Sequence, residues 1–378
     1  MKAYFDHAST SPLAKEAQAA WLDAVEQFGN PSSFHSFGRQ AKVLIEQARK
    51  GFAADLNASP SEIIFNSGAT EGLNTAIRSA AKKRGRIFCS PIEHHAVLDT
   101  VKSLTEELQL EWVHISVDSK GVMDLDFLDE LRKNDVVCCM SHNNELGNRN
   151  PIEFIARHCE EKEALLIVDS VQTAVVEALP LDSWKGVQAL AISAHKFGGP
   201  KGTGMLFWRQ GEKMHPVLHG GSQERGLRAG TQDVAGIAAM YAAWQANLSE
   251  LRTRVLSIRE RKSQLLQGIA SMDGIGVNGT QAEGDHPGIL NLRLPFEGRT
   301  SMLLFELDIN GLAVSEGSAC SSGSHQGSHV IRAIGKDEPG KANIRLSLSY
   351  QNTQEEVEFA LAVLRKVLYS DARAHQSH

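Results

Sequence analysis

The chain has 378 residues, and 39 Lys and Arg against 45 Asp and Glu give a net charge of −6 with histidine neutral. This length suggests roughly two domains of about 150 residues each, with enough chain for a large core. Apolar residues make up 42% and charged residues 22%, which excludes a disordered or fibrous protein. The mildly acidic balance, without clusters of Lys and Arg, argues against nucleic acid as a direct partner.

No apolar run is long enough to cross a bilayer, and Asp6 and His7 interrupt the start of the chain, where a signal peptide needs an apolar segment. We therefore expect a cytoplasmic protein without a membrane partner. The cysteines are odd in number and have no CxxC spacing, which favours neither a disulfide framework nor a zinc ribbon. They are Cys89, Cys138, Cys139, Cys159 and Cys320.

From about residue 62 to residue 209, short apolar runs alternate with segments of helical period. This pattern is typical of a parallel sheet whose strands are joined by crossover helices. The runs expected as strands are 63–65, 86–90, 111–117, 135–141, 164–170, 187–193 and 204–208. Pro151 suits the first position of one crossover helix. The pattern predicts a large, doubly wound, mostly parallel α/β domain over residues 12–250.

The pattern changes after Glu250, where a long charged helix is expected to begin. Strands are expected at 288–294 and 343–349, and a capping box of Thr353 and Glu356 opens the last helix. These elements predict a smaller α+β domain made of residues 1–11 and 251–378. Residues 315–329 are rich in Gly and Ser and poor in apolar side chains, so we expect a mobile loop there.

Two polar residues stand where expected strands end. Lys196 follows the run 187–193, and Asp169 lies at the end of the run 164–170. Taken singly, Lys196 reads as a solvated loop lysine and Asp169 as the cap of a turn. Together they match the needs of pyridoxal phosphate: a lysine that forms a Schiff base with the aldehyde, and an aspartate that keeps the pyridine nitrogen protonated.

A phosphate group needs its own site, and the segment 67–72, SGATEG, can supply it. The segment follows a strand and opens a helix, so backbone N–H groups and the helix dipole face a bound anion. Thr70 can add its hydroxyl, with Ser193 and His195 reaching from the other strand end. The alternative for SGAT alone is an ordinary helix N-cap.

Adjacent histidines, His94 and His95, follow the run 86–90. A neutral imidazole can stack on a pyridine ring and pass protons. A metal site is the alternative, but adjacent side chains point in different directions and no third ligand of suitable spacing is near, so we expect no metal.

These segments resemble the class V aminotransferase group of fold-type I pyridoxal-phosphate enzymes, and more narrowly the cysteine desulfurases of the NifS/IscS kind. The resemblance covers nearly the whole chain, in family order. Its motifs are YFDHASTSP, GNPSSFH, IIFNSGATEGLN, EHHAVLD, HNNELG, IVDSVQTA, SAHKFGGPKG, HGGSQERGLRAGT, SEGSAC and NIRLSLS.

The resemblance implies a role for each matching residue. Lys196 carries the cofactor, His94 stacks over its ring, Asp169 faces the pyridine nitrogen and Gln172 contacts the ring hydroxyl. The phosphate site it implies comprises Ala69, Thr70, Ser193 and His195, closed by Thr231 from the partner subunit of a homodimer.

Cys320 defines the narrower group. The other four cysteines lie in expected strands or helices and read as buried structural residues, whereas Cys320 lies in the Gly/Ser segment. The resemblance implies that its thiolate takes the sulfur of L-cysteine as a persulfide and releases L-alanine. A sulfur-acceptor protein, in cluster assembly or tRNA thiolation, then receives the sulfur.

The substrate's α-carboxylate calls for a planar, fork-shaped donor. Arg345 best matches the family's carboxylate-binding arginine, and Asn144 and Asn30 are expected to help orient the substrate. The alternative for Arg345 is a surface ion pair.

The chain departs from the usual family wording at Ala194, at Glu316 and in the segment from Ser349 on, which leaves the choice of acceptor open. A selenocysteine lyase, or another class V lyase or aminotransferase, is the alternative activity. A catalytically silent scaffold for sulfur transfer is the alternative from outside the enzymes.

Overall fold

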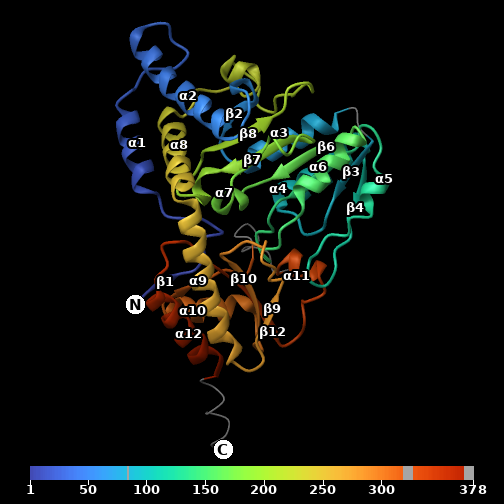
Figure 1. Ribbon diagram of the computed structural model, residues 1–378, viewed down its shortest axis with the longest axis vertical. Helices are drawn as coiled ribbons and strands as arrows, with labels where there is room; N and C mark the ends of the chain where they lie inside the picture. The colour runs from blue at the N-terminus through green and yellow to red at the C-terminus, as the bar shows by residue number, and fades with distance from the viewer. Residues whose placement is uncertain (83–84, 318–326, 370–378) are drawn as a thin grey trace, which may run out of the picture.

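The computed structural model describes residues 1–82, 85–317 and 327–369 (Figure 1). A large part, which carries the principal sheet, lies above a smaller part in Figure 1, and the long helix α9 (Leu251–Ala270) runs down from one to the other. In the described part of the chain, no helix combines the length and apolar character that crossing a membrane requires.

The principal sheet has seven strands in the order β2-β8-β7-β6-β5-β3-β4. Every pair is parallel except those of β8, which runs antiparallel to β2 and β7. No crossover helix separates β7 from β8, so the chain returns in the opposite direction. The strands are β2 (Ile63–Asn66), β3 (Arg86–Cys89), β4 (Glu111–His114), β5 (Val136–Met140), β6 (Leu165–Asp169), β7 (Val187–Ser193) and β8 (Gly204–Trp208).

Helices cover both faces of this sheet, which confirms the doubly wound prediction. One apolar core includes Phe52, Ile155 and Trp244, and the other includes Ile77 and Val101. The helices are α1 (Lys15–Val25), α2 (Ser36–Asp55), α3 (Ala69–Ala81), α4 (His95–Leu108), α5 (Phe127–Glu130), α6 (Ile152–Glu161), α7 (Thr173–Val176) and α8 (Val234–Ser249). Short 3₁₀ turns occupy Pro60–Glu62, Ala194–Lys196 and Gln223–Gly226.

The smaller part has an antiparallel sheet in the order β12-β10-β9 and a short parallel pair, β1 with β11. Its own apolar core includes Ala3, Phe5 and Leu364, and the division near residues 11 and 250 stays a prediction. The strands are β1 (Ala3–Tyr4), β9 (Gly276–Asn278), β10 (Ile289–Pro295), β11 (Leu312–Ala313) and β12 (Lys341–Ser347). The remaining helices are α10 (Thr300–Ile309), α11 (His329–Ala333) and α12 (Gln354–Tyr369).

Several local predictions can be checked against these elements. The capping box is confirmed, because Thr353 N–H donates to Glu356 and Glu356 N–H donates to Thr353 Oγ1. Cys89, Cys138, Cys139 and Cys159 are buried, as expected.

Other boundaries differ from the predictions. Pro151 is the N-cap of α6 rather than its first residue. The last strand ends at Ser347, because Ser349 N–H turns to donate to Asn352 Oδ1. The expected loop 315–329 is too wide at both ends, since Ser315 pairs with Arg345 and His329 begins α11.

Candidate active site

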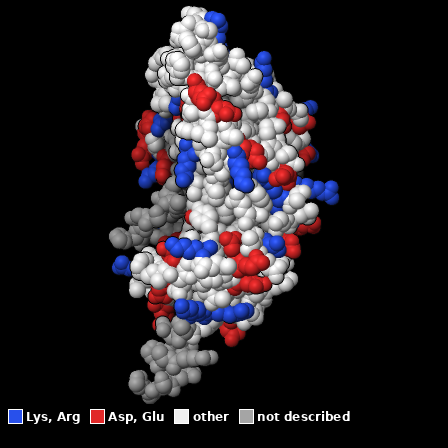
Figure 2. All heavy atoms as spheres, turned by 90° about the vertical axis from the view of Figure 1, so that its left-hand side faces the viewer, with Lys and Arg blue, Asp and Glu red and all other residues white. Residues whose placement is uncertain are grey.

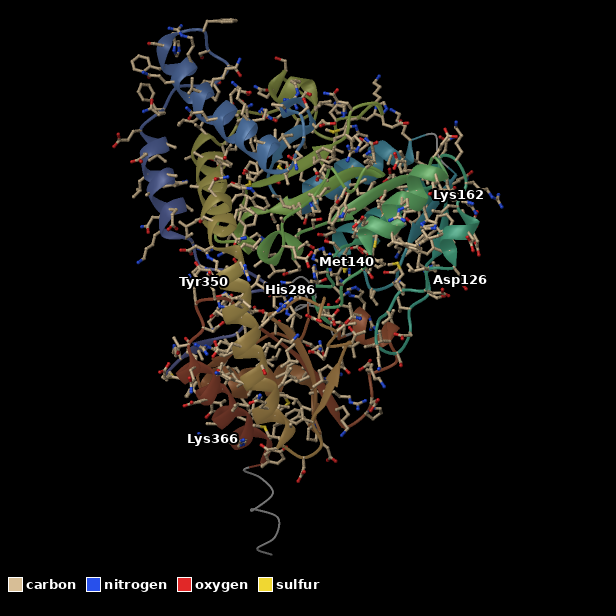
Figure 3. All side chains as sticks on the ribbon, viewed as in Figure 1. Asp126, Met140, Lys162, His286, Tyr350 and Lys366 are labelled. Carbon is tan, nitrogen blue, oxygen red and sulfur yellow. The ribbon has the colours of Figure 1, made fainter. Side chains whose placement is uncertain are left out.

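A cavity of about 240 Å³ opens at the carboxyl ends of the parallel strands, where the two parts of the molecule meet. Figure 3 shows Met140, which lines this cavity, and His286 near this junction. Most of the predicted site residues line it: Ala69, Thr70, His94, Asn144, Asp169, Gln172, Ser193, His195, Lys196 and Arg345. The carboxyl end of an open α/β sheet is where such folds bind their ligands.

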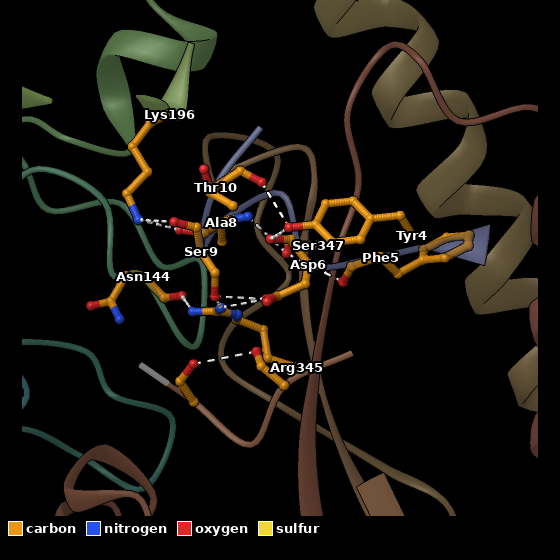
Figure 4. Close-up of polar contacts among 12 residues, drawn as sticks. Tyr4, Phe5, Asp6, Ala8, Ser9, Thr10, Asn144, Lys196, Arg345 and Ser347 are labelled. Carbon is orange, nitrogen blue, oxygen red and sulfur yellow. Dashed lines mark hydrogen bonds and ion pairs between the residues drawn. The ribbon is translucent and has the colours of Figure 1, made fainter. Parts of the chain in front are cut away.

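Lys196 ends the short 3₁₀ turn that follows β7. Its Nζ donates hydrogen bonds to the carbonyl of Ala8, at 2.6 Å, and to that of Ser9, at 2.8 Å (Figure 4). The amine is therefore held inside the cavity, against the N-terminal segment, rather than in solvent. This placement excludes the alternative of a solvated loop lysine.

Asp169 ends β6 and is buried. Burial raises the pKa of its carboxyl to about 6, although the Val171 N–H, 3.0 Å from Oδ1, and the charge of Lys196 both favour the ionised form. A carboxylate in this environment gains strongly from a cationic partner. A protonated pyridine nitrogen has that charge.

His94 is the N-cap of α4, and its Nδ1 accepts the N–H of Ala96 at 3.1 Å. Burial and the nearby charge of Lys196 lower the pKa of its imidazole to about 4. The ring is therefore neutral at physiological pH, with its proton on Nε2. A neutral, fixed imidazole in the cavity wall suits stacking on an aromatic ring.

The segment predicted to bind phosphate lies where β2 leads into α3. Gly68 has a φ of +148°, which glycine adopts at least cost, and a Cβ there would lie 3.2 Å from Ser193 Oγ. Ala69 N–H donates to the same Oγ at 3.4 Å. The His195 Nδ1 lies 3.2 Å from Thr10 Oγ1, and burial lowers the pKa of His195 to about 4. This end of the cavity thus offers backbone N–H groups and hydroxyls to a ligand, with a neutral histidine beside them.

Arg345 lies in β12 and is buried, which excludes the alternative of a surface ion pair. Its Nη1 donates to the Asn144 carbonyl at 2.8 Å, and its Nη2 donates to Ser9 Oγ at 2.7 Å and to Asp6 Oδ1 at 2.9 Å (Figure 4). Its Nε has no hydrogen-bond partner among the described residues. A guanidinium in the wall of a cavity favours an anionic ligand group.

Two predicted residues do not line this cavity, and a third lines it with a different contact. Asn30 lies before α2, where its Oδ1 accepts the Ser32 N–H, and its expected role toward the substrate stays a prediction. Thr231 is exposed and does not line the cavity. Gln172 lines it, but its Nε2 donates to the Ala8 carbonyl at 3.1 Å. Cys320 lies outside the described residues.

Sequence reasoning missed the N-terminal segment as a wall of the site. Ser9 contacts both Lys196 and Arg345, and Asp6 holds Arg345. The sequence feature that could have indicated this wall is the mostly polar segment DHAST, which directly follows Tyr4 and Phe5. Such a run cannot continue a core strand and points to a surface or a site.

Glu93 was also missed. It is fully buried, and its Oε1 accepts the N–H of Met140 at 2.9 Å. Burial, and to a lesser extent the charge of Asp169, raises the pKa of Glu93 well above its ordinary value. A protonated Glu93 leaves Asp169 as the charged group on this side of the cavity.

The side chains at this cavity suit a cofactor with a carbonyl carbon, a basic ring nitrogen and a phosphate. Lys196, Asp169 and the start of α3 suit these three groups in that order. The chain matches the model of the family "Aminotransferase class-V" over residues 3–359, and it belongs to that family.

Proteins of similar sequence include several that are named cysteine desulfurases. The chain is 38% identical over 374 residues to "Cysteine desulfurase IscS" of Dictyoglomus turgidum (strain DSM 6724 / Z-1310), covering 97% of this chain and 94% of that protein. It is 37% identical to an "IscS-like cysteine desulfurase" of Mycobacterium tuberculosis (strain ATCC 25618 / H37Rv), covering 96% and 95%.

Two solved structures superpose on this chain over most of its length. A "NIFS-LIKE PROTEIN" superposes with a TM-score of 0.90 at 34% identity, covering 98% of this chain and all of that one. "SspA in complex with cysteine" superposes with a TM-score of 0.79 at 28% identity, covering 93% of this chain and all of that one.

Proposed function

We propose that the protein is a pyridoxal-phosphate-dependent cysteine desulfurase, which converts L-cysteine to L-alanine and passes the sulfur on. The observation that carries the proposal is the meeting of Lys196, Asp169 and Arg345 in one cavity, in a chain with desulfurase relatives along nearly its whole length. Lysine and aspartate serve the cofactor, and arginine serves the carboxylate of an amino acid.

The bound cofactor supplies an electrophilic carbonyl carbon and a ring that accepts charge from the substrate's Cα. Lys196 would hold the cofactor through its Nζ, and the same Nζ would take the proton from the substrate's Cα. Asp169 keeps the proton on the ring nitrogen, and the neutral His94 covers the ring. Arg345 would hold the α-carboxylate with its guanidinium.

Cys320 is the proposed sulfur acceptor. Its thiolate attacks the substrate sulfur, so that an S–S bond forms as the substrate's Cβ–S bond breaks. The electron pair of the broken bond stays with carbon, which takes up a proton and leaves as L-alanine. No external oxidant is needed, because carbon is reduced as sulfur is oxidised. The persulfide stays on Cys320 until a thiol or an acceptor protein takes it.

We further propose a homodimer in the cytoplasm that delivers sulfur to an acceptor protein. Exposed apolar side chains gather on α1 and around the start of α2, where Phe34 is 95% and Phe28 78% exposed. Figure 2, which faces this side, shows a largely uncharged surface at its upper end. A patch of this kind favours a subunit interface, and such a dimer would let Thr231 serve the neighbouring site.

The deciding experiment measures L-alanine released from L-cysteine, with excess reductant, by the holoenzyme and by Cys320→Ala. Alanine from the former and almost none from the latter supports the proposal. Equal rates would assign the site to another class V lyase or aminotransferase. A parallel assay with selenocysteine tests the lyase alternative, because preference for selenocysteine would replace the proposed substrate.

A further inference from the structure

A carboxylate stands at the phosphate-binding end of the site. Glu71 lies in the first turn of α3 and lines a second cavity of about 440 Å³, which shares Ser9, Ala69 and Thr70 with the first. Within the described residues, Glu71 is the one carboxylate in the wall of this cavity. A helix start binds phosphate through its N–H groups, so an uncompensated negative charge there opposes a doubly charged ligand.

Arg228 supplies the compensation. Its Nε lies 2.9 Å from Glu71 Oε1, and its Nη2 lies 3.3 Å from Oε2, so the guanidinium engages both carboxylate oxygens. Oε2 also accepts the N–H of Ser67 at 2.9 Å, which ties the pair to the loop that precedes α3. Both side chains are largely buried, with 23% and 14% of their surfaces exposed. Water therefore screens this pair less than it screens a surface pair.

The segment that carries Arg228 is itself anchored beneath the site. Glu224 is buried and accepts from Arg49 Nη1 at 2.7 Å, from Arg49 Nη2 at 2.8 Å and from Phe65 N–H at 3.1 Å. Glu224 and Arg225 both have left-handed backbones, with φ of 46° and 59°. Non-glycine residues hold such angles at a cost, which the buried ion pair offsets. The segment thus presents Arg228 in one position, with Thr231 three residues further on.

We propose that Arg228 is a positioning residue for the cofactor: by neutralising Glu71 it makes the start of α3 able to bind a dianionic phosphate. The inference rests on the proposed function, since the phosphate is that of the proposed cofactor.

A double-mutant cycle tests this charge pairing. The readout is the dissociation constant of pyridoxal phosphate, measured by its absorbance after graded dilution of the holoenzyme. Arg228→Gln should weaken binding by about tenfold to a hundredfold, because Glu71 loses the cation that is hydrogen-bonded to it, and Lys201 in the same cavity wall compensates the carboxylate only in part. Glu71→Gln should not weaken binding, and Arg228→Gln combined with Glu71→Gln should recover most of the loss. Arg228→Lys, which keeps the charge, should lie close to the wild type.

A purely structural role predicts a different pattern, in which the double variant binds as weakly as Arg228→Gln, and this result would overturn the inference. Arg78→Gln is the matched control. Arg78 forms an ion pair with Glu107 near the other end of the same helix, at 2.8 Å, and its loss should leave cofactor affinity unchanged. In Arg228→Gln, inorganic phosphate should also bind more weakly than in the wild type, by a factor similar to that for pyridoxal phosphate. A wild-type protein that binds no pyridoxal phosphate would instead refute the proposed function.

Discussion

Asp169 combines a functional benefit with a cost to stability. Its carboxyl has a pKa of about 6 in the folded chain against an ordinary value of 3.8, so the charged form is penalised by folding. The penalty is absent at low pH, grows between about pH 4 and 6, and is complete above pH 6. Asp169→Asn should therefore stabilise the cofactor-free protein by about 2–3 kcal/mol at pH 7.5, and by about half of that at pH 5.

Urea unfolding of the cofactor-free protein at the two pH values measures this difference. The same variant should lose at least about a hundredfold in activity, since the ring nitrogen loses its anionic partner. A variant that is less stable than the wild type at both pH values would show that the buried charge is already compensated within the protein.

Glu93 provides a contrasting test, because burial favours its neutral form. Glu93→Gln keeps the volume, the neutrality and an acceptor for the Met140 N–H, so cofactor affinity should change by no more than about threefold. Glu93→Ala should leave that N–H without a partner, at a cost of about 1–3 kcal/mol. Thermal melting and cofactor titration of both variants compare the two. An equal loss of thermal stability and of cofactor affinity in both variants would mean that Glu93 acts through a negative charge.

At the scale of elements, the N-terminal segment joins the two parts of the molecule. Phe5 is fully buried in the core of the smaller part, and the chain then reaches Ala8 and Ser9 at Lys196. Phe5→Ala should cost about 3–5 kcal/mol and should speed hydrogen exchange in β1 and β11. Phe305→Ala on α10 is the control, because that side chain is 67% exposed. Unchanged hydrogen exchange in β1 would show that Phe5 does not stabilise the pairing of β1 with β11.

The local sequence pattern predicted most of the helices and strands. It also predicted that Lys196 and Asp169 lie together. The strands of the principal sheet carry continuous apolar runs, and β7 and β8 have the predicted bounds. Lys196 and Asp169 could be paired from sequence because parallel strands bring their carboxyl ends to one edge. The N-terminal wall could not be predicted, since Lys196 meets Ala8 across 188 positions and Arg345 meets Asp6 across 339. No local period encodes such contacts. Asn30 and Thr231 do not line the cavity of this chain, so their roles stay predictions.

At the scale of the whole molecule, the apolar surface around α1 and the start of α2 predicts self-association. Phe28→Asp combined with Phe34→Asp should convert a dimer to a monomer, because two exposed aromatic rings become charges in an interface. Sedimentation measures the mass, and cofactor absorbance reports whether the separated chains keep their ligand. A variant that stays dimeric would place the interface elsewhere. A monomer that retains full cofactor affinity would argue against a contribution from the neighbour's Thr231.

Lys196 holds the N-terminal segment through the carbonyls of Ala8 and Ser9, and it is one of several attachments. Gln172 Nε2 donates to the Ala8 carbonyl, and the N–H groups of Ser11 and Ala14 donate to the carbonyls of His195 and Gly198. The placement of the two cores therefore does not depend on a single amine, and Lys196 can change its bonding partner while the segment stays fastened to the large part.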